Sequence, residues 1–174
     1  MTINTHRSTA RMVTQALIAG TTLLLASQAF AASTLSAADQ SFVAKVSQGG
    51  MFEVASSKLA VEKAQAQDIK DMANTEVHDH TLVGDKLAAI ASKNGDTFPT
   101  DLNADFTQRM QKLQALSGAN FDMAYAAEMK RIHAIDGAAF MAEAKNAQNP
   151  DLKAFAAETA GIVKMHIGSW KTVR

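Results

Sequence analysis

The sequence predicts an all-α protein, an up-and-down four-helix bundle with a short extra helix in the central connection. Its composition is one reason: alanine is abundant, aromatic residues make up only 6% of the chain, and there are two prolines, which suits helices better than strands. Apolar residues also recur at helical spacing between recognisable capping residues, and no segment alternates as a half-buried strand does. The length of 174 residues suits a single domain.

The first two long helices are expected to meet at a short turn. Ser36 and Asp39 have the spacing of a capping box, which predicts a helix from there to about residue 67. Asp68 is expected to open the second helix, because acidic residues favour the first turn. That helix should end near Gly95, since glycine commonly follows a helix. A loop containing one proline then leads to the short helix.

The second half of the chain predicts one short and two long helices. Residues 102–117 place apolar side chains on one face and predict the short helix. The next helix is expected to start near Asn120 and to run to about residue 148. Asn149 followed by Pro150 marks a strong boundary, because asparagine caps helices and proline is favoured at the first helical position. The last helix should continue to about residue 171.

The first 31 residues have the pattern of a secretory signal peptide. Arg7 and Arg11 precede an apolar run over residues 16–26, and small residues follow at Ala29 and Ala31. This order predicts cleavage after Ala31 and a mature bundle domain over residues 32–174. We therefore expect an exported protein of the periplasm or cell envelope. No later stretch is apolar enough to predict a transmembrane segment in the mature chain.

Charge and cysteine content argue against several classes of function. The chain has 17 basic and 17 acidic residues, and this balance argues against a nucleic-acid partner, which would require a basic surplus. The absence of cysteine excludes disulfides, thiolate metal sites and cysteine nucleophiles. The predicted bundle must therefore be held together by its own core.

Charged and polar side chains lie inside the apolar stripes of the predicted helices, which is unusual for a bundle core. Of the four histidines beyond the predicted signal peptide, only His78, on the face opposite His80, is expected in solvent. Three histidines therefore point inward, each from a different helix. The candidate site comprises Glu53 in the first helix, Glu76 and His80 one turn apart in the second, His133 in the fourth segment and His166 in the last.

Two interpretations of this set remain open. Burying an unpaired carboxylate costs several kcal/mol, so the groups must meet each other, a water or a metal. Glutamate and histidine are ligands that Fe, Mn, Zn and Cu accept, which predicts a transition-metal ion as cofactor and partner. Met129 and Met165 lie near histidines and would suit copper, although helical methionines usually fill cores. Alternatively, the groups form a closed polar network that only sets the helix register.

Several segments resemble one known family. They are residues 42–54, residues 76–80 (Glu-Val-His-Asp-His), Phe121-Asp122 with Tyr125 and His133, and His166. Together they resemble the exported, ferritin-like family called domain of unknown function 4142, over residues 38–170. The resemblance implies a ferritin-like four-helix bundle and an envelope location, and it implies no established activity.

The sequence departs from ferritin-like di-iron proteins at a decisive position. Those proteins carry Glu-x-x-His on two helices, whereas Val77 precedes His80 and Val163 precedes His166 by three residues. The carboxylates are too few to support a dinuclear oxidase centre, so an oxidase-like enzyme at the same residues is the least favoured of three hypotheses. The two leading hypotheses are a metal-binding bundle of the envelope and a non-catalytic structural or interaction protein.

Overall fold

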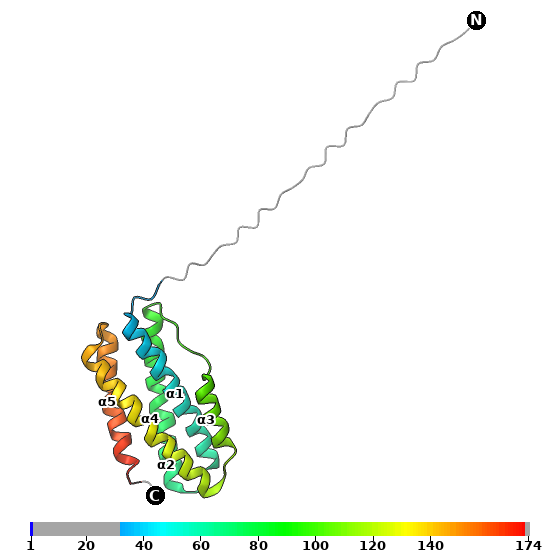
Figure 1. The fold of residues 1–174 in the computed structure, drawn as a ribbon, viewed down its shortest axis with the longest axis vertical. Helices are drawn as coiled ribbons and strands as arrows, with labels where there is room; N and C mark the ends of the chain where they lie inside the picture. The colour runs from blue at the N-terminus through cyan, green and yellow to red at the C-terminus, as the bar shows by residue number, and fades with distance from the viewer. Residues whose placement is uncertain (2–31, 173–174) are drawn as a thin grey trace.

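Five α-helices make up the described part of the chain, which is Met1 and residues 32–172 of a computed structural model (Figure 1). No strand occurs in that part, and the predicted all-α bundle is confirmed. The predicted signal peptide, apart from Met1, lies outside the described residues. The helices are α1 (Ala37–Lys63), α2 (Gln67–Lys93), α3 (Ala104–Gln114), α4 (Gly118–Asn146) and α5 (Pro150–Ser169).

Two helical hairpins form the bundle, α1 with α2 and α4 with α5 (Figure 1). The connection between them is long, because α3 returns the chain along the bundle before α4 begins. Consequently α2 and α4 run in the same direction, and one long crossover of this kind is the ferritin-like arrangement. The short helix lies in the central connection, as predicted, and runs along the flank of the bundle beside α1.

The ends of α1 and α5 follow the predicted capping chemistry. Ser36 Oγ accepts a hydrogen bond from the Asp39 backbone N–H (3.1 Å) and so caps α1. Asn149 Oδ1 accepts from the backbone N–H groups of Asp151 and Leu152, both at 3.0 Å, with Pro150 at the first helical position. These bonds satisfy N–H groups that a helix start leaves without partners.

The beginning of α2 differs from the prediction. Asp68 was expected to open this helix, but α2 begins at Gln67. The turn before it is held by Asp122 of α4, whose carboxylate accepts from the backbone N–H groups of Gln65 (3.0 Å) and Ala66 (2.8 Å). α4 starts at Gly118, close to the start expected near Asn120, and no side chain caps it. Before α2, a tertiary contact takes the place of a local cap.

The interior consists of two apolar clusters separated by a polar layer. Each cluster draws residues from both hairpins, and the charged residues of the candidate site lie between them. The polar layer therefore sits midway along the bundle. One cluster includes Phe42, Val46, Leu87, Phe140, Leu152 and Phe155, and the other includes Phe52, Ile69, Phe121, Tyr125, Ile132 and Trp170.

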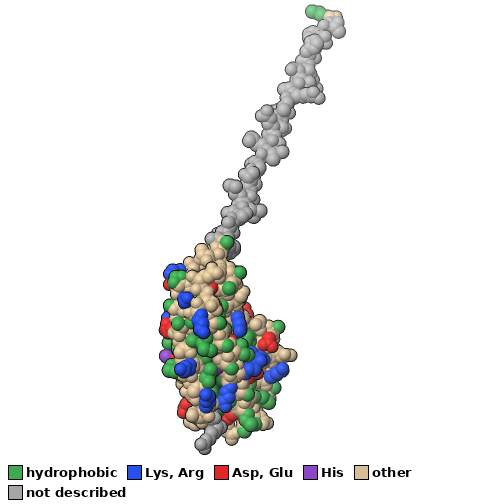
Figure 2. Space-filling model, turned by 60° about the vertical axis from the view of Figure 1, so that its left-hand side comes forward, with side chains coloured by type: hydrophobic (Ala, Val, Ile, Leu, Met, Phe, Trp, Pro, Cys, Tyr) green, Lys and Arg blue, Asp and Glu red, His purple; other side chains and the backbone are tan. Residues whose placement is uncertain are grey.

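The outer surface is mixed in character. In the view of Figure 2, lysine and arginine side chains are scattered among hydrophobic and other atoms and do not form one continuous basic stripe. Within residues 32–172, no helix combines the length and the apolar character needed to cross a bilayer. This agrees with the prediction for the chain beyond residue 31.

Candidate metal centre

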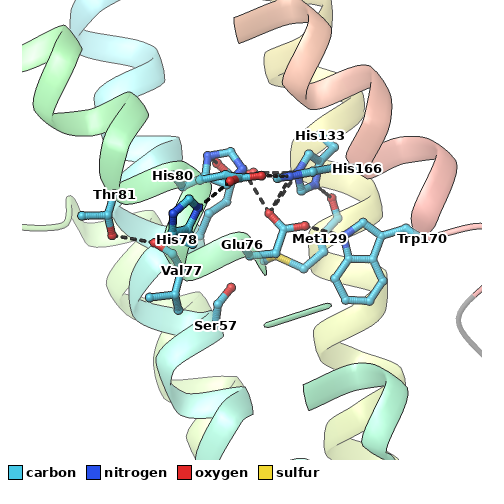
Figure 3. Close-up of polar contacts among 12 residues, drawn as sticks. Ser57, Glu76, Val77, His78, His80, Thr81, Met129, His133, His166 and Trp170 are labelled. Carbon is cyan, nitrogen blue, oxygen red and sulfur yellow. Dashed lines mark hydrogen bonds and ion pairs between the residues drawn. The ribbon is translucent and has the colours of Figure 1, made fainter. Parts of the chain in front are cut away.

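The polar layer is a compact cluster of one carboxylate and three imidazoles (Figure 3). Glu76 and His80 come from α2, His133 from α4 and His166 from α5. All four are buried, with relative exposures between 0% and 3%, whereas the His78 side chain is 73% exposed. The predictions that three histidines point inward and that His78 faces solvent are therefore confirmed.

One oxygen of Glu76 is the geometric centre of the contacts. Glu76 Oε2 lies 3.0 Å from His80 Nε2, 3.0 Å from His166 Nδ1 and 3.3 Å from His133 Nε2. The nitrogens of His133 and His166 are themselves 3.1 Å apart. One ligand atom from each of the four residues lies within 4.8 Å of the others. Glu76 Oε2 and His80 Nε2 are buried with no hydrogen-bond partner in the described part of the protein, despite their proximity.

The outward-facing nitrogen of each imidazole lies beside an oxygen. His133 Nδ1 contacts the Met129 carbonyl oxygen at 2.7 Å, and His166 Nε2 contacts Asp79 Oδ2 at 2.9 Å. His80 Nδ1 lies 3.2 Å from Glu53 Oε2. An imidazole that donates an N–H from its outer nitrogen to such an oxygen carries, in its neutral form, a lone pair on the inner nitrogen. With all three rings in this tautomer, three lone pairs would face one carboxylate oxygen.

Glu53 lies at the edge of this cluster and outside the group of four. Its Oε1 is 3.5 Å from His133 Nε2, and its Oε2 faces the outer nitrogen of His80. Burial, and then the charges of Glu76 and Asp136, raise the pKa of Glu53 well above its ordinary value. The structure thus brings all five predicted residues together, with Glu53 placed to orient His80.

The pKa values of the cluster differ in direction. Burial alone would raise the pKa of Glu76, but the imidazoles of His133, His166 and His80 close to its carboxylate hold it well below its ordinary value. Burial lowers the pKa of His80, and Glu76 offsets only part of that effect. The pKa of His166 is raised, because Glu76 and Asp79 outweigh the opposing effect of burial. Of His80 and His166, His166 is therefore the one that more readily holds a proton.

Sequence reasoning missed two residues that contact the cluster. Asp79 binds His166 from the surface side, and the Trp170 indole Nε1–H donates to Glu76 Oε1 at 2.6 Å. Trp170 could have been found, since it lies one turn beyond His166 on the same face of α5. Asp79 lies about 60° from Glu76 around α2, at the margin of the apolar stripe and not inside it, so periodicity does not single it out.

The spacing of the four inner atoms suits a small divalent ion. Ligand atoms about 2.1 Å from an ion at the centre of a regular tetrahedron lie about 3.4 Å from one another. The measured separations of 3.0–3.3 Å around Glu76 Oε2 would need to widen only slightly. An oxygen in contact with the outer nitrogen of each imidazole, as found here, is also typical of metal-binding histidines. The four ligand atoms, all within 4.8 Å of one another, could therefore hold a single small ion.

The fold and the cluster define an all-α helical-bundle protein with a buried histidine–glutamate layer. The chain belongs to the family described as Domain of unknown function (DUF4142), which matches residues 25–173. No curated protein matches the sequence.

A similar fold occurs in a solved structure described as the crystal structure of a DUF305 fragment from Deinococcus radiodurans. The two chains superpose with a TM-score of 0.69 and share 12% sequence identity, and the match covers 79% of this chain and 95% of the other. At this identity the likeness concerns the helical fold alone.

Proposed function

We propose that this protein is an exported, non-catalytic component of the cell envelope that binds one transition-metal ion. Glu76, His80, His133 and His166 are the proposed ligands, and Glu53 is a carboxylate that orients His80. Export rests on the pattern of residues 1–31. It is tested by fractionating the native cells and sequencing the N-terminus of the recovered protein, which should begin at Ala32.

The observation that carries the metal proposal is the arrangement of proton acceptors. Three imidazole lone pairs and Glu76 Oε2 face one small buried space, while the outer nitrogen of every ring faces an oxygen. Acceptors without a donor between them repel, so this arrangement requires a cation or a proton. A divalent ion would interact with all four atoms at once.

Among the candidate ions, the geometry favours Zn(II). Zinc is bound tetrahedrally by nitrogen and oxygen ligands, and closed sites use four protein ligands. Cu(II) favours square-planar ligand sets and Mn(II) favours octahedral oxygen sets, which the cluster does not offer. Four protein ligands also leave no open position for a substrate, which supports a non-catalytic role.

The alternative is a polar layer held together by a proton on His166. A protonated His166 can donate from Nδ1 to Glu76 (3.0 Å) and from Nε2 to Asp79 (2.9 Å). The raised pKa of His166 favours this form. In that case the cluster would stabilise the fold without any metal.

Metal analysis of the native protein decides between the two. Protein purified without a metal-affinity tag should contain one equivalent of zinc, lose it to a chelator and regain it on dialysis against Zn(II). His133→Ala and Glu76→Gln should abolish tight binding. Asp85→Asn, which removes an exposed acid from the same helix, should retain it. A wild-type protein that takes up no metal after stripping and reloading would leave the polar-layer alternative.

A further inference from the structure

The proposed ion needs a route to a centre that is almost closed to solvent. The four ligands are 0–3% exposed, so a hydrated ion cannot reach them directly. Their surroundings offer two approaches: a surface cavity between α2 and α5 that Asp79 lines, and a larger cavity between α1 and α2 that His80 lines. The chemistry of these two walls differs.

We infer that the ion is captured at the surface by His78 and Asp79 and reaches the centre through His166. This inference rests on the proposed metal site. His78 Nδ1 lies 2.8 Å from Asp79 Oδ1, and Asp79 Oδ2 lies 2.9 Å from His166 Nε2. The side chains of His78 and Asp79 are 73% and 25% exposed, while that of His166 is 3% exposed. These three residues form a continuous series of metal-binding groups from solvent to the cluster.

The cavity between α2 and α5 is suited to an incoming cation. It has a volume of about 140 Å³, and Asp79 is part of its wall. The other charged residues in this wall are Lys86 and Glu158, which form an ion pair and so largely offset each other. Asp79 is therefore the anionic group that an approaching ion meets, with the His78 imidazole beside it.

The cavity between α1 and α2 is larger, at about 570 Å³, but offers few ligands. Its walls are mainly apolar, including Val46, Leu87 and Phe98, although Asp85 and Asp101 also line it, and it meets the cluster at His80. No hydrogen bond or ion pair among the described residues links either acid to His80, so an ion entering there would lose its hydration beside apolar side chains without a connected series of ligands, which is unfavourable. Stepwise exchange of water for Asp79 and then His166 avoids that loss.

His166 is well placed to transfer the ion inward. It lies in the last turn of α5, which ends at Ser169. Terminal turns open more readily than helix centres. Nε2 would release its proton to water as it binds the ion, and a turn of the imidazole would then move this nitrogen from Asp79 to the position facing Glu76, where Nδ1 now lies.

Zinc uptake kinetics test this route. Metal-free protein is mixed in a stopped-flow instrument with Zn(II) held by a weak chromophoric chelator, and equilibrium affinity is measured separately. His78→Ala should slow uptake by roughly tenfold, the low end of the effect of removing a group that supports a metal ligand, and should slow release by the same factor, because the four final ligands are unchanged. Asp79→Asn should slow uptake and also weaken affinity by roughly 10–100-fold, because it no longer orients His166 as a carboxylate.

Two matched controls address the other cavity. Asp85→Asn removes the same charge from α2 but lines the cavity beside His80, and Gly84→Leu fills that cavity, since a Cβ at Gly84 meets no atom within 4 Å. Both should load at the wild-type rate. Slow uptake in Gly84→Leu with normal uptake in His78→Ala would overturn the inferred route, as would wild-type rates in all four variants. If the wild-type protein binds no zinc at equilibrium, the metal proposal fails first and the route fails with it.

Discussion

Glu76→Gln separates metal binding from fold stability, because glutamine keeps the shape of the side chain and removes its charge. The amide oxygen can still accept from Trp170 Nε1, which now bonds Glu76 Oε1 at 2.6 Å. The amide N–H group replaces Oε2 and can donate to the inner nitrogen of His133 or His166, 3.3 and 3.0 Å away. We expect the metal-free variant to fold, with a melting temperature close to wild type near pH 8.

The expected loss of affinity follows from the number of ligands. Structural zinc sites with four ligands bind with about 10–16 kcal/mol, so one ligand supplies roughly 3–4 kcal/mol. Its loss weakens binding by about 10²–10³-fold. Wild type at a free zinc concentration of 100 times Kd should gain about 2.7 kcal/mol of stability, which raises the melting temperature of a domain of this size by about 5–15 °C.

Thermal melts with and without Zn(II), together with calorimetric titration, measure both quantities. The variant should show little or no zinc-dependent shift at the concentration that saturates wild type. Wild-type zinc affinity in Glu76→Gln would refute the assigned ligand set. A different outcome would favour the polar layer held together by a proton on His166: Glu76→Gln loses stability mainly below pH 6.5, and wild type shows no response to zinc. The loss of stability would arise because a protonated His166 no longer has the Glu76 carboxylate as its partner.

Two further predictions concern stability. Gly49→Ala should lower the free energy of unfolding by about 1–3 kcal/mol in urea titrations, because a Cβ at this position would lie 2.0 Å from Asp136 Oδ2. In the matched control Gly50→Ala the new Cβ meets nothing within 4 Å, so this variant should be more stable than wild type by about 0.5–1 kcal/mol. Similar effects at both sites would contradict the packing argument. Burial, and then Asp39, raise the pKa of Glu143 to about 7, so the wild-type protein should lose stability as pH rises from the ordinary carboxyl pKa through about 7. Glu143→Gln should remove this pH dependence, and its free energy of unfolding at pH 8 should be higher than that of wild type by about 1–3 kcal/mol. Parallel stability–pH profiles of the two proteins would contradict this prediction.

Much of the fold and the cluster could be predicted because both depend on helical periodicity. Helices whose caps are local, such as those at Ser36 and Asn149, begin where expected. The inward direction of His80, His133 and His166 follows from their positions in apolar stripes. Periodicity does not tell which helices are neighbours, so the sequence alone could identify the five groups without deciding which of their atoms meet.

What could not be predicted depends on contacts between distant segments. Asp79 binds a partner 87 residues away, and this pairing exists only because α5 packs beside α2. The place of α3 depends on Arg109, which lies 4.5 Å from the centre of the Phe52 ring and pairs with Glu128 of α4. A cationic residue in a short amphipathic helix looks like a solvated one in sequence, yet here it fastens α3 to the flank of the bundle.

The division of the core by a polar layer explains why the proposed metal need not be required for folding. Small zinc domains unfold without their ion because they lack another core, whereas this bundle has an apolar cluster on each side of the layer. Removing zinc would leave repelling acceptors in the middle of a fold that both clusters hold together, and His166 can take up a proton to relieve that repulsion. A chelator should therefore lower the melting temperature while leaving the far-ultraviolet circular dichroism helical. Complete unfolding by the chelator at 25 °C would show that the two clusters do not stabilise the bundle by themselves.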